Sequence, residues 1–365
     1  MSIEPVLEFD ENNLMKDAIR IGTKTIDANS PVFIIAEIGV NHNGDLDLAK
    51  TMVTEAKRCG ADCVKFQTFK ADRVVTHDAP KAHYQMHTTN PEQSQLKMLE
   101  AVELSHEQHR QIMAHAKNED LVFMSTPYNR EDVDFLEGLD VPAYKLASIS
   151  CAEPSFIEYV AATGKPVILS TGMATLSEVD GAVRALRNTG NHQVIVLQCT
   201  TNYPSRVEDA NIRAMVTMGD ALSTWVGYSD HTENDIACIM SVALGARLIE
   251  KHFTTDQHLP GPDHSSSSTP DAFCNLVSRI RQAEQILGDG LKQPCEIEIT
   301  NSTGMRRSLV AASNIEKNAI ITDEMITLKR PATGMNPSLY HHVIGKRAAK
   351  HLARDKQITM DDILH

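Results

Sequence analysis

The sequence lacks several features that define common classes of protein. No apolar run in its 365 residues approaches the ~18 residues of a membrane-spanning helix. Positive charge is in deficit, because 48 acidic residues outnumber 35 Lys and Arg and leave a net charge of −13. This balance argues against a nucleic-acid-binding protein, which usually carries a basic stripe. The N-terminus is acidic and has no apolar segment, so we expect no signal peptide.

Cysteine pairs in CxxC spacing are also missing. The seven cysteines are odd in number and scattered: Cys59, Cys63, Cys151, Cys199, Cys238, Cys274 and Cys295. Most of them lie in apolar periodic segments. This placement predicts reduced thiols in the core of a cytoplasmic protein.

What the sequence has is a regular alternation of short apolar runs and amphipathic helical segments. Eight apolar runs are predicted strands: 32–38, 63–66, 122–125, 143–146, 167–169, 194–197, 225–228 and 247–250. Eight strand–helix repeats predict an α/β fold, a (β/α)8 TIM barrel. A doubly wound open sheet is the alternative. It fits less well because eight strands close a barrel and no glycine-rich dinucleotide fingerprint follows the first strand.

The chain divides into four predicted parts. We expect an N-terminal extension at 1–30, the barrel at 31–292, a linker at 293–304 and a small domain at 305–365. A domain of that size is too small to be very stable alone, so it is expected to dock on another surface. Within the barrel, the polar connection at 70–104 is long enough to be a lid or a substrate wall, with a surface insertion as the alternative.

Two histidines follow the last two predicted strands. His231 ends the phrase Gly-Tyr-Ser-Asp-His, and His252 ends Leu-Ile-Glu-Lys-His. Because the ends of parallel strands face the same way, the two imidazoles could bind one divalent metal, with water or substrate in the open positions. Two unrelated histidines are the alternative on spacing alone.

Two lysines, Lys65 and Lys145, emerge from otherwise apolar strands. Hydroxyl residues recur near the same strand ends: Thr126, Ser148, Ser170, Thr201 and Ser229. Chemistry in a (β/α)8 barrel sits at the C-terminal ends of its strands, so we expect these groups to form a phosphate or carboxylate site. Snorkelling or salt-bridged lysines are the alternative. A divalent metal beside such a site suggests polarisation of a substrate carbonyl.

Several motifs resemble those of one family, the sialic acid (nonulosonate) synthases. They are Ala-Glu-Ile-Gly-Val-Asn-His-Asn-Gly at 36–44, Val-Lys-Phe-Gln at 64–67, Leu-Ser-Thr-Gly-Met at 169–173, Gly-Tyr-Ser-Asp-His at 227–231, Glu-Lys-His at 250–252 and Gly-Pro-Asp-His at 261–264. In the C-terminal part, Leu-Lys-Arg-Pro at 328–331 and Val-Ile-Gly-Lys at 343–346 resemble the antifreeze-like (SAF) domain of that family. The motifs stand in the order typical of the family.

The resemblance implies an enzyme of the transferase class. In the implied reaction phosphoenolpyruvate condenses with the open-chain aldehyde of an N-acetylmannosamine-type sugar and releases phosphate by C–O cleavage. The product would be N-acetylneuraminate or legionaminate. The resemblance also implies Mn²⁺ or Mg²⁺, and a cytoplasmic homodimer in which the SAF domain of one subunit caps the barrel of the other.

The resemblance further implies roles for individual residues. The metal falls to His231 and His252, and Glu37 is the carboxylate near the reacting carbons, for acid–base chemistry or for positioning. Phosphoenolpyruvate falls to Lys65, Thr126, Lys145, Ser148, Ser170, Thr201 and Ser229. The sugar would be contacted by Gln67, Asn90, Tyr203 and Asp263 of the same subunit. Arg330 would contact it from the partner subunit.

Three positions depart from the family pattern, and all concern the sugar. Ser150 stands where an acidic residue is usual, Thr201 where some members have Asn, and Met305 where some have an aromatic residue. They question the substrate, not the reaction class, and favour slightly a 6-deoxy diacetamido product such as legionaminate. Two alternatives remain: a non-catalytic barrel that binds a sugar or phosphoenolpyruvate, and a metal-dependent aldolase that uses pyruvate.

Overall fold

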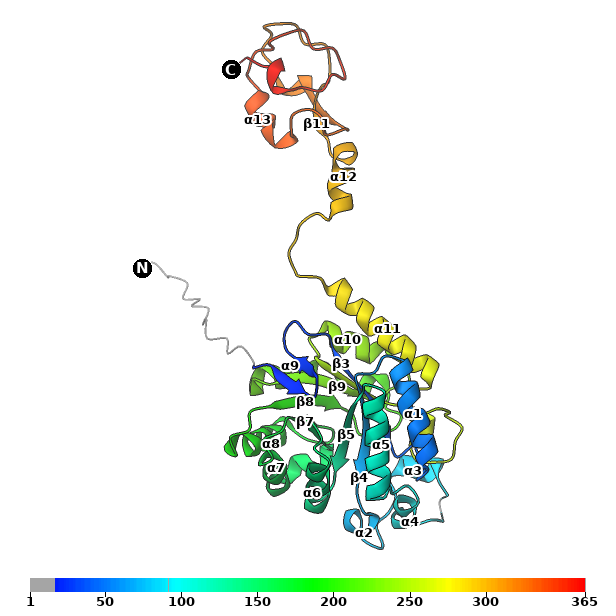
Figure 1. The fold of residues 1–365 in the computed structure, drawn as a ribbon. Coiled ribbons are helices and arrows are strands. Elements are labelled where there is room, and N and C mark those ends of the chain that lie inside the picture. The colour runs from blue at the N-terminus through cyan, green and yellow to red at the C-terminus, as the bar shows by residue number, and fades with distance from the viewer. Residues whose placement is uncertain (1–16, 91, 365) are drawn as a thin grey trace, which may run out of the picture. The chain divides into compact units, whose positions relative to one another are not determined.

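The computed structural model describes residues 17–90 and 92–364. It divides into two compact units, the first ending at Gly288 and the second beginning at Asp289 (Figure 1). The expectation that the chain has no signal peptide concerns the acidic N-terminal segment, which lies outside the described residues. Among the helices in the described ranges, none combines the length and the apolar character that a membrane crossing requires.

The first unit is built on eight parallel strands. They are β3 (Phe33–Gly39), β4 (Cys63–Thr68), β5 (Val122–Pro127), β6 (Tyr144–Leu146), β7 (Val167–Ser170), β8 (Val194–Cys199), β9 (Trp225–Asp230) and β10 (Leu248–His252). Hydrogen bonds join them in the order β5-β4-β3-β10-β9-β8-β7-β6. The two strands at the ends of this order, β5 and β6, also contact each other, so the sheet curves into a nearly closed barrel. The predicted TIM-barrel class is confirmed, and the open-sheet alternative is wrong.

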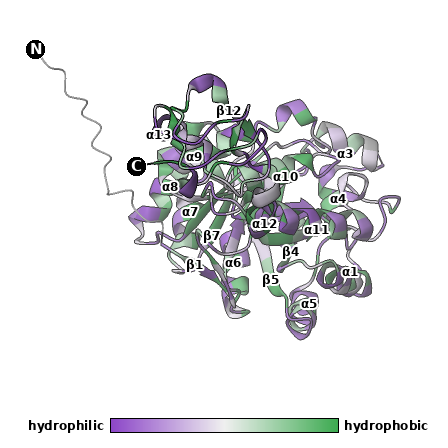
Figure 2. Ribbon diagram, turned by 90° about the horizontal axis from the view of Figure 1, so that it is seen from above, coloured by the Kyte–Doolittle hydropathy of each residue, from purple (hydrophilic) through white to green (hydrophobic). Residues whose placement is uncertain are grey.

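Helices surround the barrel and cover the outer face of the strands (Figure 1). They are α1 (Leu46–Arg58), α5 (His106–Asn118), α6 (Arg130–Gly138), α7 (Pro154–Ala161), α8 (Leu176–Asn188), α9 (Arg213–Leu222), α10 (Ile236–Ala243) and α11 (Pro270–Leu287). Figure 2 shows both hydrophilic and hydrophobic residues along outer helices such as α1 and α5. This mixture fits helices that bury one stripe against the sheet and expose the other. Capping residues mark where α5 and α8 begin. The side chains of Ser105 and Thr175 each accept a backbone N–H and form a capping box.

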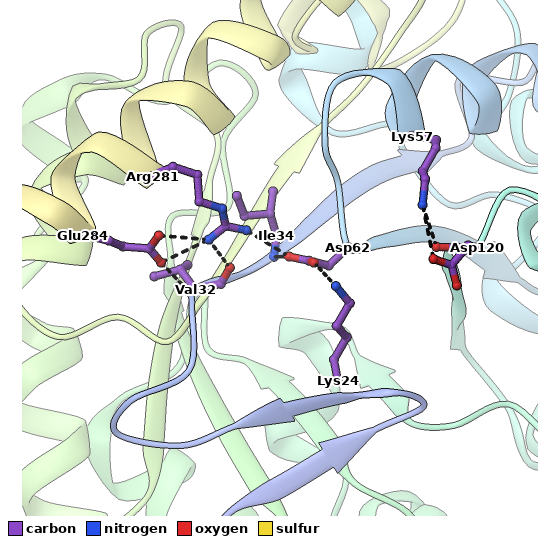
Figure 3. A network of polar contacts seen from close by, with 8 residues as sticks. All are labelled: Lys24, Val32, Ile34, Lys57, Asp62, Asp120, Arg281 and Glu284. Atoms are coloured by element: carbon purple, nitrogen blue, oxygen red, sulfur yellow. Dashed lines mark hydrogen bonds and ion pairs between the residues drawn. The ribbon is translucent and has the colours of Figure 1, made fainter.

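The N-terminal half of the barrel interior is apolar. A small hairpin of β1 (Ile19–Ile21) and β2 (Lys24–Ile26) packs its isoleucines against the inward residues Phe33 and Ile35. Asp62, just before β4, ties this end together because it bonds the hairpin through Lys24, the strand through the Ile34 N–H, and α11 through Arg281 (Figure 3). This end of the barrel is therefore closed and serves stability.

The connection between β4 and α5 carries three short helices of its own. They are α2 (Ala71–Val74), α3 (His83–Thr88) and α4 (Gln95–Glu100). Phe69 and Val102, at the two ends of this connection, pack with Val40 in a small apolar cluster. The segment is thus packed at both ends on the C-terminal face of the barrel.

The second unit has its own apolar core. It contains α12 (Glu296–Met305), β11 (Ser308–Ala311), β12 (Ile326–Lys329) and α13 (Tyr340–Val343). Leu309, Ile321 and Ile358 are fully buried within it. Helix α12 lies across most of the stretch that we expect to be a linker and buries none of its residues.

The cysteine prediction needs one correction. Cys59 and Cys274 form a disulfide, although they are 215 residues apart. The bond joins the end of α1 to the N-terminal part of α11, two helices that pack side by side on the barrel. The pairing depends on the adjacency of these helices, which a local sequence pattern does not contain. The other five cysteines are free.

Candidate active site

The inward face of the strands changes character along the barrel axis. Side chains alternate along a strand, so on β3 Phe33 and Ile35 point inward and are followed by Glu37. On β10 the same face carries Leu248 and then the polar Glu250 and His252. Each strand thus delivers apolar side chains to the closed end of the barrel and polar side chains to its C-terminal end.

The polar side chains meet in one cavity of about 250 Å³ at the C-terminal end of the barrel. Twelve of the fifteen predicted site residues line it: Glu37, Lys65, Gln67, Thr126, Lys145, Ser148, Ser170, Tyr203, Ser229, His231, His252 and Asp263. They come from all eight strands or the loops that follow them. The cavity therefore brings together groups that lie more than two hundred residues apart in the chain.

Three predicted residues are not among those that line this cavity. Asn90 is exposed, bonds the Glu92 N–H and lines a neighbouring cavity with Asn43. Thr201 is exposed and does not line the central cavity. Arg330 is an exposed residue of the second unit, directly after β12. Ser150, which replaces an acidic residue of the family, is buried and does not line the cavity either.

The floor of the cavity holds a network of buried ions. Lys65 Nζ lies 2.6 Å from Glu37 Oε2 and 3.8 Å from Glu250 Oε2. Lys145 Nζ lies 3.2 Å from Glu250 Oε1, which also accepts a 2.8 Å hydrogen bond from Ser229. Lys65 donates to Thr126 Oγ1 at 3.2 Å. All four ions are at most 3% exposed, so their mutual attraction is little screened by water.

The two carboxylates differ sharply in their pKa values. Burial would raise the pKa of Glu250, but attraction to Lys145 and Lys65 outweighs it and lowers the value to about 2. Burial raises the pKa of Glu37 to about 7, against the attraction of Lys65 and with the help of the negative charge on Glu250. Glu250 is therefore a permanent anion, while Glu37 can exchange a proton near neutral pH, which suits a general acid or base.

The two lysines differ as well. Burial alone would lower the pKa of Lys65, but the two carboxylates outweigh it and raise the value. For Lys145 burial prevails and the pKa is lowered. An incoming anion would contact both ammonium groups, because each faces the cavity.

His231 and His252 stand side by side, with ring centroids 5.4 Å apart. Burial lowers the pKa of both, which favours the neutral imidazole. The Nδ1 of His231 lies 2.6 Å from the Thr200 carbonyl oxygen and must donate to it, which leaves Nε2 as a lone-pair donor facing the cavity. No cluster of three or more His, Cys, Asp or Glu able to hold a metal occurs among the described residues. The pair fits a divalent ion whose other ligands come from water and substrate.

A second part of the cavity lining, here called the wall, has a different character. The connection between β4 and α5, with Val40, contributes apolar side chains: Val40, Phe69, Val74, Val75, Met98 and Leu99. Tyr84 of α3 lies 5.0 Å from the ring of Tyr203, which in turn lies 4.2 Å from His231. The wall thus reaches Tyr203, whose ring stands beside His231.

Asp263 also lines the cavity, and burial raises the pKa of its carboxyl to about 6. Its charge also contributes to the raised pKa values of Tyr84, Tyr128 and Tyr203, for each of which burial is the larger cause. A buried carboxylate among phenol rings is an acceptor suited to a hydroxyl or amide donor of a ligand.

The cavity is also lined by residues that sequence reasoning missed. Glu250 was recoverable, because it lies two residues before His252 and so points to the same face of β10. Tyr128 donates to Gln67 Oε1 at 3.1 Å and follows β5 directly. Tyr84, Gln85 and Leu99 come from the connection between β4 and α5, where no period marks the inward face.

Two family profiles and several known proteins match the chain. The NeuB family profile matches residues 52–292, and the SAF domain profile matches residues 306–364. The N,N'-diacetyllegionaminic acid synthase of Campylobacter jejuni is 41% identical over 327 residues, which cover 89% of this chain and 98% of that protein. The enzyme of the same name from Legionella pneumophila is 40% identical over 346 residues, which cover 94% and 97%. The crystal structure of the N-acetylneuraminic acid (sialic acid) synthetase from Leptospira borgpetersenii, in complex with citrate, superposes with a TM-score of 0.71 at 31% identity, covering 79% of this chain and 95% of that one.

Proposed function

The chain belongs to the NeuB family, and from that premise we propose that it is a nonulosonic acid synthase. It condenses phosphoenolpyruvate with the open-chain aldehyde of an N-acetylmannosamine-type sugar. The observation that carries this proposal is the single cavity in which two buried lysines, a proton-exchanging carboxyl and a histidine pair converge. A cavity with these groups can hold an anion and an aldehyde next to an acid–base residue.

The residues divide the work as follows. Lys65, Lys145 and the neighbouring hydroxyls bind the phosphate and carboxylate of phosphoenolpyruvate, and Glu250 favours the charged form of both ammonium groups. His231 and His252 hold Mn²⁺ or Mg²⁺, which when bound polarises the aldehyde. Carbon 3 of phosphoenolpyruvate forms a bond to the aldehyde carbon, whose oxygen gains the electrons of the C=O π bond and awaits a proton.

Glu37 serves the second half of the reaction. The new bond leaves carbon 2 electron-deficient, and water adds to it. Glu37 accepts a proton from that water and passes it to the former aldehyde oxygen. Phosphate then departs with the electrons of its bond to carbon 2 and takes the remaining hydroxyl proton, which leaves a ketone at carbon 2. Its position beside Lys65 and Gln67, and its pKa of about 7, support this role.

The wall of the cavity favours a 6-deoxy diacetamido sugar, and hence a legionaminate-type product, over N-acetylmannosamine. Its apolar side chains suit methyl groups, whereas a sugar hydroxyl placed against them would lose its hydrogen bonds to water. The legionaminic acid synthases among the relatives support the same choice.

A panel assay tests both the reaction and the sugar. The protein is incubated with Mn²⁺, phosphoenolpyruvate and each candidate sugar, and released phosphate and the mass of the product are measured. Phosphate release that depends on a sugar supports the synthase. A pyruvate-using aldolase would release none, and a non-catalytic barrel would give neither phosphate nor product.

We also propose a cytoplasmic homodimer in which Arg330 of the partner subunit completes the sugar site. Arg330 is exposed in a unit with its own core, so its guanidinium is available to hydroxyl or acyl oxygens. Mixing an inactive Arg330→Ala dimer with an inactive Glu37→Ala dimer should restore part of the activity, because each mixed dimer contains one intact site. If labelled subunits exchange and no activity returns, the role in trans is wrong.

A further inference from the structure

Behind the two histidines lies a second buried ion pair that does not line the cavity. Strands β9 and β10 pair in parallel, and Lys251 lies opposite Asp230 in their last hydrogen-bonded rung. His231 and His252 each follow one residue later. Because side chains alternate, the histidines point into the cavity while Asp230 and Lys251 point out of the barrel, toward α10.

The ammonium group of Lys251 has a full set of acceptors. It donates to Asp230 Oδ2 at 2.6 Å, to the Thr232 carbonyl oxygen at 2.5 Å and to the Asn234 carbonyl oxygen at 3.1 Å. The other oxygen of Asp230 accepts the Thr232 N–H at 2.9 Å. The pair therefore joins three things: the end of β9, the end of β10 and the turn that leaves His231.

The rings of both histidines contact Tyr203, with ring centroids 4.2 Å away for His231 and 5.4 Å away for His252, and their polar restraints are few. The His231 ring is held by the Thr200 carbonyl, but Nδ1 of His252 is buried and has no hydrogen-bond partner among the described residues. The position of the His252 ring thus depends on its backbone. Pairing with Glu37 of β3 and the Ser268 N–H hold this backbone on one side, and the side chain of its neighbour Lys251 ties it to β9 and to the turn after His231.

Stability alone does not account for the pair. Asp230 and Lys251 are 1% and 4% exposed, and removing two charges from water costs about as much as their attraction returns. An apolar pair of similar volume would fill the same space between strands and helix. What an apolar pair could not do is hold two backbone carbonyls of the turn after His231.

We propose that Asp230 and Lys251 are positioning residues that hold His231 and His252 at the separation needed to share one divalent cation. The inference rests on the metal site of the proposed function and deepens it. It assigns no contact with substrate to either residue.

The test compares Mn²⁺ affinity among purified variants, with free Mn²⁺ read from its electron paramagnetic resonance signal. Lys251→Met, and the uncharged double variant Asp230→Asn with Lys251→Met, should bind Mn²⁺ about 10–100-fold more weakly, as loss of groups that orient metal ligands typically does. In both, activity should recover in part at high Mn²⁺, with the Michaelis constant for phosphoenolpyruvate unchanged. The double variant is included because it leaves no unpaired buried charge that could prevent folding.

Two controls separate the possible outcomes. Val160→Ala in α7 creates a cavity far from the site, so it should lower the melting temperature and leave Mn²⁺ affinity unchanged. His252→Ala should abolish Mn²⁺ binding, and if it does not, the metal site is wrong and the positioning role falls with it. If His252→Ala abolishes binding while the double variant binds Mn²⁺ as tightly as the natural protein, the positioning role alone is overturned.

Discussion

The floor and the wall of the cavity are built from different kinds of chain. The floor consists of side chains at the ends of parallel strands, buried and paired with one another, such as Lys65, Lys145 and Glu250. The wall consists mainly of apolar and aromatic side chains from the short helices between β4 and α5, such as Val74 and Tyr84. The strand ends of the barrel hold the charged groups of the floor at fixed positions. The wall provides an apolar surface whose shape can match that of a ligand. We infer that the floor determines the reaction and the wall determines the sugar.

The largest effect is expected from substitutions of the two histidines at the strand ends. His231→Ala or His252→Ala should remove metal-dependent turnover, a loss of about 10³-fold or more, because several kcal/mol of charge stabilisation disappears. The fold should remain, since both side chains line a cavity. Phosphate release with added Mn²⁺ checks the loss, and circular dichroism checks the fold. Full activity of the natural protein after EDTA treatment would show that the metal role is wrong.

The second effect concerns the anion. Lys65→Met or Lys145→Met should weaken phosphoenolpyruvate binding by more than ~2 kcal/mol, the scale of a lost charge-assisted contact. The Michaelis constant for phosphoenolpyruvate measures it. Lys165→Met is the matched control, because that lysine pairs with Glu137 and Asp140 away from the cavity. If the Michaelis constant for phosphoenolpyruvate is unchanged in both Lys65→Met and Lys145→Met, these lysines do not bind phosphoenolpyruvate.

These predictions depend on residues that the sequence pattern could identify. The strands are short apolar runs, and their ends in a parallel barrel share one face, so the pattern alone places Lys65, Lys145 and both histidines together. The same pattern predicts Glu250, because residues two apart on a strand point to the same face and Glu250 lies two residues before His252. The family resemblance and the fold class are confirmed by the comparisons and by the barrel.

The wall could not be predicted in this way. No period marks which residues of α2, α3 and α4 face the cavity, so Tyr84 and Leu99 carried no signal, and Asn90 lies outside the cavity where we expected it. The disulfide of Cys59 and Cys274 was missed for a related reason, since packing between distant helices decides it. The position of an irregular segment is determined by its tertiary contacts. A local sequence pattern does not contain information about those contacts.

A third prediction tests the buried charge of the floor through stability. Burial raises the pKa of Glu37 from 4.5 to about 7, so the folded protein holds this proton more tightly than the unfolded chain does. The stabilisation is complete below pH 4.5 and is lost as the pH rises to about 7. Relative to Glu37→Gln, which cannot titrate, the free energy of unfolding of the metal-free natural protein should fall by roughly 2 kcal/mol between pH 5 and pH 8.

Urea unfolding followed by the fluorescence of the single tryptophan, Trp225 on β9, measures this difference for the barrel. Glu100→Gln, at an exposed position on α4, is the matched control and should show no such dependence on pH. A difference that grows toward high pH would reverse the sign and contradict a buried, proton-holding Glu37.

The smallest expected effect tests the wall. Val74→Thr keeps nearly the same shape and adds one hydroxyl to an apolar surface. That hydroxyl can bond a sugar hydroxyl and cannot bond a methyl group, so the ratio of kcat/KM for N-acetylmannosamine to that for the 6-deoxy diacetamido sugar should rise. A gain of about 1 kcal/mol corresponds to about fivefold. The Michaelis constant for phosphoenolpyruvate should stay the same, because the floor is untouched. Val207→Thr, at an exposed valine outside the cavity, should leave the ratio unchanged. If Val74→Thr changes phosphoenolpyruvate binding and leaves the ratio between sugars unaltered, the separation of reaction and specificity between floor and wall is wrong.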